Sequence, residues 1–476
     1  MKQLLLFFLG VQSLLAFGQN VEVSDEIYVG SATGYGILGK FNDRFLFYHL
    51  DNDEVKLRAF DGKMRKIWER EVQPDNKRAS KVLDVVGNRT DFSVVYHFRK
   101  KNHTYIKVHK YDGQVKLLDS ATIFDWGKDF LTPSLDIKFS EDKKCALIYE
   151  LIEGRRFRAL AFSLDSLKPI WEQTVEVNDW NMGENFQQIL FTNRAEAFFI
   201  QEENNRIGSD KHRFKIQRAD SEGKFTSMMP LKDRATVDVK FSFDNVNRKL
   251  VAAGVYSGKT FGKAQGYFTF SLPPQYKSDE PFTFYNQAFD DEFVTAFLGK
   301  KTTDNKGLLD MKIQEIVHRR DGGILAIFEQ VKLVERRIAS TGITRYVNRS
   351  DALALAMDYY HDNFFALSIS NEGVTHWKSI FFKKQSSQDD DGRYASYCLV
   401  KTPSSLRFLF NDEIERATTV SEYTLNATGE TERHSVMNTA GQELYLRFHD
   451  GVQTGTNEVI VPSEDRRRIK LVKIQF

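Results

Sequence analysis

Apolar and polar residues alternate along most of this chain, in short runs that are separated by polar turns. Alternation with a period of two residues is typical of β-strands that turn one face toward a core. Long stretches with the apolar spacing of an amphipathic helix are hard to find. The pattern therefore predicts a protein that is close to all-β.

A turn-forming unit recurs along the chain at nearly constant intervals. Each copy is a cluster rich in Asp, Asn, Ser and Gly between two alternating runs, which is the signal for a tight β-hairpin. The first four copies are centred on Asp61, Asp112, Asp165 and Asp220, which are 51, 53 and 55 positions apart, and two further copies contain Gly373 and Gly429. Such an interval is typical of a four-stranded propeller blade.

The strongest strand of each repeat gives a count of the blades. Eight such strands are expected, at residues 45–48, 94–97, 145–149, 197–200, 250–255, 324–328, 406–410 and 459–461. The runs 21–29 and 469–476 lie at the two ends of the mature chain, so we expect them to complete one blade together. The prediction is a single β-propeller of eight blades, closed by pairing of the N- and C-terminal strands. Seven blades is the alternative, because the units that begin near Val237 and Met311 are longer than one repeat.

Composition narrows the class of protein. The 476 residues include 67 Lys+Arg against 65 Asp+Glu, 41% hydrophobic residues and 39 Phe. This excludes a disordered chain and a disulfide scaffold, and the balanced charge gives no basis for nucleic-acid binding. The two cysteines, Cys145 and Cys398, lie in apolar strand-like runs and are expected to be buried free thiols. No cofactor and no resident metal is expected, since no complete metal-binding or catalytic motif is present.

The N-terminus has the pattern of an export signal. Lys2 precedes an apolar stretch that ends in small residues before Gln19, so residues 1–19 are predicted to be a cleaved signal peptide. The propeller domain is then predicted to span residues 20–476. No later run is long enough to predict a transmembrane helix. We therefore expect an exported protein.

Part of the chain resembles a known group of proteins. The resemblance covers residues 321–412 and rests on short segments at 321–326, 359–363, 373–380, 390–397 and 408–412. These segments resemble a pattern common in secreted Bacteroidota proteins with β-propeller-like repeats. The resemblance implies the fold and an envelope location, and it transfers no catalytic residue. The chain ends in its last strand without room for a C-terminal sorting domain, which favours the periplasm over the cell surface or the extracellular space.

The links from the last strand of one blade to the first strand of the next suggest a binding surface. They share one face of a propeller with the turns between second and third strands, and loops on a rigid scaffold commonly carry recognition. Acidic and aromatic side chains recur in these links, whereas the turns of the same face are basic. The predicted binding residues are Asp125, Trp126, Asp129, Asp179, Trp180, Asp290, Asp291, Asp389, Asp390, Asp391 and Arg393.

Two arrangements of this face are open from the sequence. The first is an acidic and aromatic mouth inside a basic rim. The second is a set of solvated turns, with Trp126 and Trp180 folded back between the blades.

Two functions also stay open. The first is a non-catalytic envelope scaffold, monomeric by itself, that binds another envelope protein; an outer-membrane secretion or uptake channel is one candidate partner. The alternative is a carbohydrate-active or other hydrolytic enzyme that uses acids at the mouth.

Overall fold

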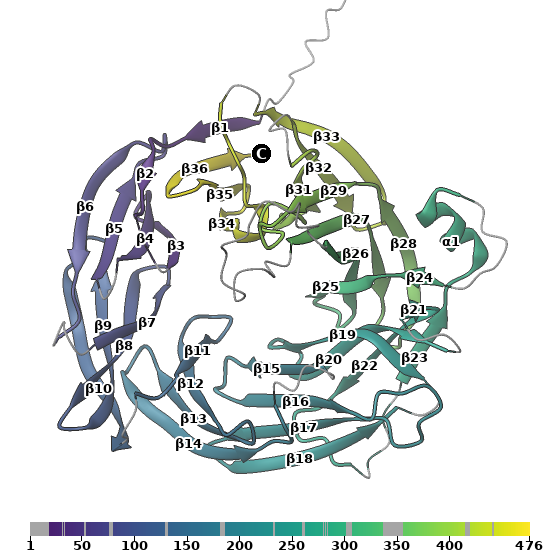
Figure 1. The fold of residues 1–476 in the computed structure, drawn as a ribbon, viewed down its shortest axis with the longest axis horizontal. Coiled ribbons are helices and arrows are strands. Elements are labelled where there is room, and N and C mark those ends of the chain that lie inside the picture. Colours follow the sequence, from purple (N-terminus) through teal and green to yellow (C-terminus); the bar gives the residue numbers. More distant parts are fainter. Residues whose placement is uncertain are drawn as a thin grey trace, which may run out of the picture.

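The protein is described from a computed structural model. It covers residues 19–476 except residues 31, 33, 52–53, 76–79, 129–131, 181–185, 232–233, 259–261, 279, 281, 283, 301–306, 337–355, 415–418 and 440–441. Nearly all of the predicted signal peptide, residues 1–18, lies outside the described part. The described chain forms an eight-bladed β-propeller, which confirms the predicted fold class and the predicted count of eight blades. The blades form a ring around a common axis (Figure 1).

The first four blades are regular antiparallel sheets whose four strands follow one another in the sequence. Blade 1 consists of β3 (Gly34–Phe41), β4 (Arg44–Asp51), β5 (Glu54–Phe60) and β6 (Lys66–Val72). Blade 2 consists of β7 (Ser80–Gly87), β8 (Asp91–Lys100), β9 (His103–Asp112) and β10 (Leu117–Lys128). Blade 3 consists of β11 (Asp136–Phe139), β12 (Cys145–Ile152), β13 (Arg156–Ser163) and β14 (Lys168–Glu176). Blade 4 consists of β15 (Gln187–Phe191), β16 (Ala197–Glu203), β17 (Arg213–Asp220) and β18 (Gly223–Pro230).

The next three blades are also antiparallel, and blade 6 has an additional strand. Blade 5 consists of β19 (Ala235–Asp244), β20 (Lys249–Ser257), β22 (Gly266–Leu272) and β23 (Phe284–Ala288). Blade 6 consists of β25 (Met311–His318), β26 (Ile324–Arg336), β27 (Ala356–Ile369) and β28 (Thr375–Phe381), and β29 (Gln385–Gln388) pairs with β27. Blade 7 consists of β30 (Cys398–Lys401), β31 (Ser405–Asn411), β32 (Thr419–Asn426) and β33 (Thr431–Asn438).

Both ends of the chain build blade 8. It consists of β34 (Val452–Gly455), β35 (Glu458–Asp465) and β36 (Arg468–Gln475), with β1 (Asn20–Val23) and β2 (Ile27–Tyr28) both paired to β36. The short helix η1 (Phe448–Asp450) precedes β34. Ser24 separates the two N-terminal strands, and its Oγ accepts a hydrogen bond from the Leu471 backbone N at 2.9 Å. The predicted closure by the two termini is thus confirmed, with two short strands in place of one continuous strand over 21–29.

The extra length of the fifth repeat comes from a helix and a small sheet, whereas the sixth repeat has the long strands β26 and β27 and the added strand β29. Helix α1 (Asp291–Leu298) follows β23 and lies outside the ring (Figure 1). Strands β21 (Lys263–Ala264) and β24 (Leu308–Leu309) form a small separate sheet beside it. These insertions lengthen the repeat without adding a blade, so the longer spacing does not reduce the count to seven. No helix in the described residues is long and apolar enough to span a membrane.

The core is divided among the contacts between neighbouring blades. Eight clusters of buried apolar side chains each join one blade to the next. Phenylalanine pairs bridge several of these contacts: Phe157 and Phe199 have ring centroids 5.0 Å apart, and Phe364 and Phe408 have centroids 5.1 Å apart. Aromatic pairs at such distances add to the stabilisation that burial supplies. The large number of Phe residues is therefore explained by blade-to-blade packing.

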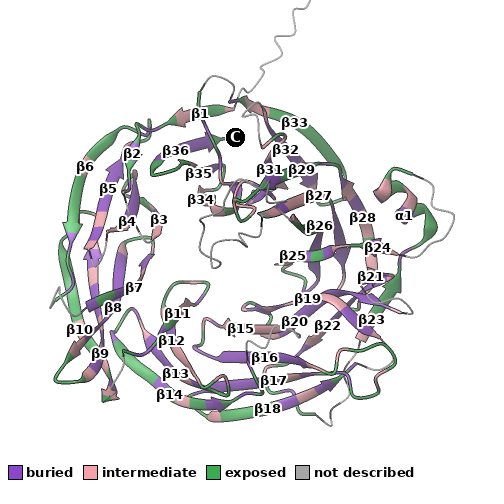
Figure 2. Ribbon diagram, viewed as in Figure 1, coloured by how far each residue is buried: buried purple, intermediate pink, exposed green. Residues whose placement is uncertain are grey.

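Burial follows position within each blade. The second and third strands are largely buried because other blades cover both of their faces, whereas outer strands such as β6, β14 and β18 carry many exposed residues (Figure 2). Cys145 is partly buried, Cys398 is buried, and both are free thiols as predicted. Burial raises the pKa of Cys145 to about 11 and that of Cys398 to about 12.

Candidate functional site

Each antiparallel blade divides its connections between two faces of the ring. The turns between second and third strands and the links between blades lie on one face, which we call the loop face. The turns between first and second and between third and fourth strands lie on the opposite face, which we call the turn face. All the described residues predicted to bind a partner belong to the loop-face links or to the strand and helix ends beside them.

The first predicted pair lies near the outside of blade 2. Asp125 is exposed on β10, where its Oδ2 lies 3.0 Å from His103 Nδ1. Trp126 is only 1% exposed, and its Nε1 donates a hydrogen bond to Glu150 Oε2 at 2.9 Å. The Arg158 guanidinium lies 4.7 Å from the centroid of the same ring. Trp126 thus packs between blades 2 and 3, and the predicted Asp129 lies outside the described residues.

The equivalent pair one repeat later has the same arrangement. Asp179 is exposed and its Oδ1 lies 3.5 Å from Arg155 Nε. The Trp180 side chain is buried, with its ring centroid 4.8 Å from that of Phe157 in an edge-to-face contact. Both tryptophans are therefore folded back between blades, which is the second of the two arrangements that the sequence left open.

The third predicted pair begins helix α1. Asp290 is the N-cap, and its Oδ1 accepts a hydrogen bond from the Phe293 backbone N at 2.7 Å. Its other oxygen lies 3.1 Å from Lys378 Nζ. Asp291 lies in the first turn, where a negative charge is favourable to the helix dipole. This position is outside the ring, so the structure does not bring this pair close to the ring axis (Figure 1).

The remaining four predicted residues lie together in a short loop, which we call the 389–393 loop. Asp389 accepts hydrogen bonds from the Met357 backbone N at 2.8 Å and from Arg336 Nη2 at 3.0 Å. Asp390 turns inward and accepts from Ser387 Oγ at 2.8 Å and from the Gly392 backbone N at 3.0 Å.

The other two side chains of this loop are presented outward. The Asp391 side chain is 86% exposed and that of Arg393 is 37% exposed. The Arg393 Nε donates a hydrogen bond to the Asp390 backbone O at 2.7 Å, which fixes the guanidinium beside the loop. Arg393 Nη2 lies 3.7 Å from Asp391 Oδ2, so the loop combines internal hydrogen bonds with an exposed ion pair.

A buried charged network lies under the 389–393 loop. Glu329, on β26, is fully buried, and its Oε1 lies 2.6 Å from Lys383 Nζ, whose side chain is 1% exposed. The other Glu329 oxygen accepts a hydrogen bond from Ser396 Oγ at 2.9 Å and lies 3.3 Å from His361 Nδ1. Lys383 Nζ also donates to Gln385 Oε1 at 2.8 Å. The network connects the ends of the segment that carries the loop to the centre of blade 6.

The same network reaches blade 7 and constrains the backbone. Gln385 Nε2 donates to the Asn411 backbone O at 2.7 Å, and Gln385 Oε1 accepts from the Ser396 backbone N at 2.9 Å. Ser396 has a φ of 64°, a left-handed conformation that is uncommon for residues other than glycine. Hydrogen bonds at both its backbone N and its hydroxyl hold it there.

The charge state of Glu329 follows from its partners. Burial by itself raises the pKa of this carboxyl, but the Lys383 ammonium and the His361 ring outweigh burial and lower the pKa to about 2. Glu329 is therefore a carboxylate at neutral pH, paired with the buried ammonium of Lys383.

A second polar cluster joins the 389–393 loop to blade 8 and blade 1. Glu464 Oε2 accepts a hydrogen bond from Tyr35 OH at 2.8 Å and pairs with Arg447, whose Nη1 also donates to Tyr35 OH at 2.7 Å. Tyr394 OH donates to the Glu464 backbone O at 3.0 Å, and Arg393 Nη1 lies 3.9 Å from Glu464 Oε1. The loop is thus fixed to the blade that closes the ring.

The charges of the loop face are interleaved. The exposed acids Asp125, Asp179, Asp290 and Asp389 each pair with a basic side chain, namely His103, Arg155, Lys378 and Arg336. Two of these bases, Arg155 and Arg336, lie at the connections between second and third strands, so the acids and bases of this face are not separated into a mouth and a rim. The surface is therefore a set of local ion pairs. Among the residues that the structure describes, no group of three or more His, Cys, Asp or Glu is arranged to hold a metal ion.

Sequence reasoning did not identify the partners that hold this loop. Glu329 does give a local signal, since it follows the apolar run Ile324–Phe328 where a charge must find a buried partner. Lys383 and Ser396 give none, because their closeness to Glu329 arises only when β29 folds against β27.

The known structures that this chain is similar to are distant. The chain matches no protein-family model and no curated protein. It is similar to the structure of Porphyromonas gingivalis dipeptidyl peptidase 4, with 8% identity and a TM-score of 0.45 over 91% of this chain and 56% of that one. Saccharomyces cerevisiae Sqt1 is 8% identical, with a TM-score of 0.43 over 96% of this chain and 98% of that one.

A third similar structure is also a propeller domain, and the peptidases among the matches are about twice as long as this chain. The Vanderwaltozyma polyspora Nup133 β-propeller domain is 9% identical, with a TM-score of 0.39 over 96% of this chain and 98% of that one. The chain spans about half the length of the peptidases that it matches, at 56% of the dipeptidyl peptidase and 55% of a prolyl endopeptidase. At these identities the likeness concerns the fold alone.

Proposed function

We propose that this protein is a non-catalytic β-propeller of the cell envelope that binds another protein through its loop face. The observation that carries the proposal is the 389–393 loop, which presents the exposed charges of Asp391 and Arg393 on a segment held rigid from below. Binding surfaces that are already ordered lose less entropy when a partner docks. A rigid, charged loop on a closed ring is suited to recognition.

The contacts of the inward acid support binding over chemistry. Among the described residues, the Asp390 carboxylate accepts from Ser387 Oγ at the end of β29 and from the Gly392 backbone N, so it is occupied by the segment that carries it. A general acid or nucleophile must reach a substrate atom at hydrogen-bond distance. The exposed Asp391 and Arg393 can instead form charged contacts with a partner surface, which steer association and fix orientation.

The partner follows from the proposed compartment. A mature chain exported to the periplasm meets envelope proteins, and an outer-membrane secretion or uptake channel is the candidate that we would test first. In this proposal the propeller acts as an accessory that docks onto such a channel and is itself monomeric in solution.

A charge-reversed variant tests the proposal. The tagged protein is isolated from the cells that make it, and co-purified proteins are quantified by mass spectrometry for wild type, Asp391→Lys and the control Glu372→Lys. Glu372 is exposed in a turn on the opposite face, so its reversal matches the charge change away from the proposed surface. We expect one partner to be depleted about tenfold with Asp391→Lys and retained with Glu372→Lys.

Two results would overturn the proposal. Equal capture of every co-purified protein by all three chains would remove the 389–393 loop as the binding surface. Turnover of a chromogenic glycoside by the purified wild type, lost in Asp390→Asn while the variant keeps its thermal stability, would favour the enzymatic alternative.

A further inference from the structure

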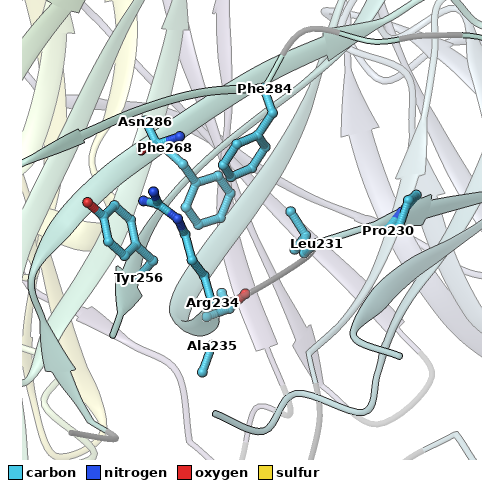
Figure 3. Close-up of a pocket in the computed structure, with 9 residues that line it drawn as sticks. Pro230, Leu231, Arg234, Ala235, Tyr256, Phe268, Phe284 and Asn286 are labelled. Carbon is cyan, nitrogen blue, oxygen red and sulfur yellow. The ribbon is translucent and has the colours of Figure 1, made fainter. Parts of the chain in front are cut away.

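A pocket of about 380 Å³ lies on the loop face between blades 4 and 5. Its walls come from the link after β18, which contributes Leu231 and Arg234, and from blade 5, which contributes Tyr256, Phe268, Phe284 and Asn286 (Figure 3). None of these residues belongs to the 389–393 loop or to its buried network. The pocket is therefore a separate feature from the proposed partner surface.

The backbone that carries Arg234 is fixed by buried polar contacts. His212 Nδ1 donates a hydrogen bond to the Arg234 backbone O at 2.8 Å, and its Nε2 lies 2.8 Å from the buried Glu202 Oε1. The His212 backbone O accepts from the Leu231 backbone N at 2.8 Å. On the other side, Asn205 Oδ1 accepts from the Thr236 backbone N at 2.9 Å. The backbone at Arg234 is thus held in place on both sides.

Its guanidinium is oriented by an aromatic ring and has a free donor. The guanidinium carbon lies 4.3 Å from the centroid of the Tyr256 ring, so stacking leaves the N–H edges directed away from that ring. Nη1 is buried, and no described residue accepts a hydrogen bond from it. Arg234 forms no ion pair with a described carboxylate either. Arg234 as a whole is partly exposed and lines the pocket, so an anion there would meet a guanidinium whose charge no described side chain balances.

Most of the other residues that line the pocket are apolar or aromatic. Phe268 and Phe284 stack with ring centroids 5.3 Å apart and an interplanar angle of 23°, and Figure 3 shows the Arg234 side chain running between Tyr256 and Phe268. Asn286 is exposed at the edge and offers a second hydrogen-bonding group. Apolar walls with few convergent polar groups are typical of small-ligand sites.

We propose that this pocket binds a monocarboxylate carried on an apolar, aromatic group. The carboxylate would accept hydrogen bonds from the Arg234 guanidinium, whose planar edge matches that anion, while the apolar group packs against Phe268 and Phe284. A single guanidinium balances a single negative charge, and the apolar walls disfavour a dianion. The carboxylate can come from a free acid or from the C-terminus of a peptide that ends in an aromatic residue.

The test uses defined probes on the full mature chain. Binding of 3-phenylpropionate and of its neutral isostere 3-phenylpropanamide is measured by calorimetry and ligand-observed NMR. The dipeptide Gly-Phe with a free or an amidated C-terminus forms the second arm. We expect at least one acid to bind about tenfold or more tightly than its amide. Binding of the free acid alone assigns a small-molecule source, and binding of the dipeptide acid alone assigns a peptide source.

Variants connect the binding to Arg234. Arg234→Gln should abolish the preference for the acid, whereas Arg213→Gln, which removes an exposed arginine paired with Glu203 nearby, should retain it. The acid-to-amide comparison in the wild type holds even if Arg234→Gln fails to fold. Equal binding of acid and amide, no binding of any probe, or an unchanged preference in a folded Arg234→Gln would overturn the proposal. None of these results depends on the 389–393 loop or its partner.

Discussion

Neutralising Glu329 should release the segment that carries the 389–393 loop. In Glu329→Gln the Lys383 ammonium keeps its hydrogen bonds to Gln385 Oε1 and to the His361 backbone O, but it loses the carboxylate 2.6 Å away. Both side chains are almost completely buried, so solvent cannot replace the lost partner. Breaking a buried ion pair from one side costs about 3–5 kcal/mol, because an uncompensated charge stays in the interior.

Two further considerations are compatible with this magnitude. The difference between the ordinary carboxyl pKa of 4.5 and the pKa of about 2 held by Glu329 corresponds to about 3 kcal/mol. In Glu329→Gln, Lys383 can also become neutral by losing its proton, which removes the unpaired buried charge. For an ordinary lysine at pH 7 that costs about 5 kcal/mol, which sets an upper bound.

Hydrogen exchange of the loop segment is the appropriate assay. The segment can open without unfolding the ring, so its exchange reports the local loss directly. We expect the opening equilibrium of residues 385–397 to rise by roughly two to four orders of magnitude in Glu329→Gln, with little change in distant blades. The double variant Glu329→Gln/Lys383→Met should recover much of the loss, since no buried charge is then left alone.

The stabilisation that Glu329 provides depends on pH. Because the pKa of Glu329 is lower in the folded state than its ordinary value, its contribution is fully present above about pH 4.5 and is lost as the pH falls toward 2. Protection of residues 385–397 should fall over that range in the wild type and should be insensitive to it in Glu329→Gln. The control is Glu176→Gln, at an exposed position of β14. Equal exchange in wild type and Glu329→Gln would refute the reasoning.

Three further predictions concern the blades and the thiols. Trp126→Ala should lower the free energy of unfolding by about 3–5 kcal/mol, measured by chemical denaturation, because the ring fills the contact between blades 2 and 3; a change below about 1 kcal/mol would contradict its burial. Gly373→Ala should lower the free energy of unfolding by about 1–3 kcal/mol more than Gly208→Ala. Both glycines have a positive φ, but a Cβ at Gly373 would lie 1.9 Å from a tyrosine ring of β23. Equal losses of stability would show that this contact relaxes freely. Burial raises the pKa of Cys145 to about 11 and that of Cys398 to about 12, so both thiols should react with iodoacetamide at pH 8 far more slowly in native than in unfolded protein. Mass spectrometry can follow the alkylation, and equal rates would contradict the burial.

The architecture could be predicted from the sequence, because a propeller repeats one local pattern. The Asp-Gly turns, the alternating strands and the apolar second strands are all short-range features, and each recurs once per blade. Closure could also be foreseen, since the alternating runs at residues 21–29 and 469–476 each need a partner strand. The insertions around α1 were harder to predict, because only packing shows that they add length outside the ring.

The candidate site was decided largely by the tertiary structure. The sequence selected the loop-face links but could not tell which tryptophans fold inward, and Trp126 and Trp180 do so because Phe157 and other side chains of adjoining blades offer apolar contacts there. The pairing of Glu329 with Lys383 and the lack of an acceptor for Arg234 could not be predicted from the sequence either. Charge pairing depends on distances of a few ångströms between residues far apart in the chain, and only the closed ring fixes those distances.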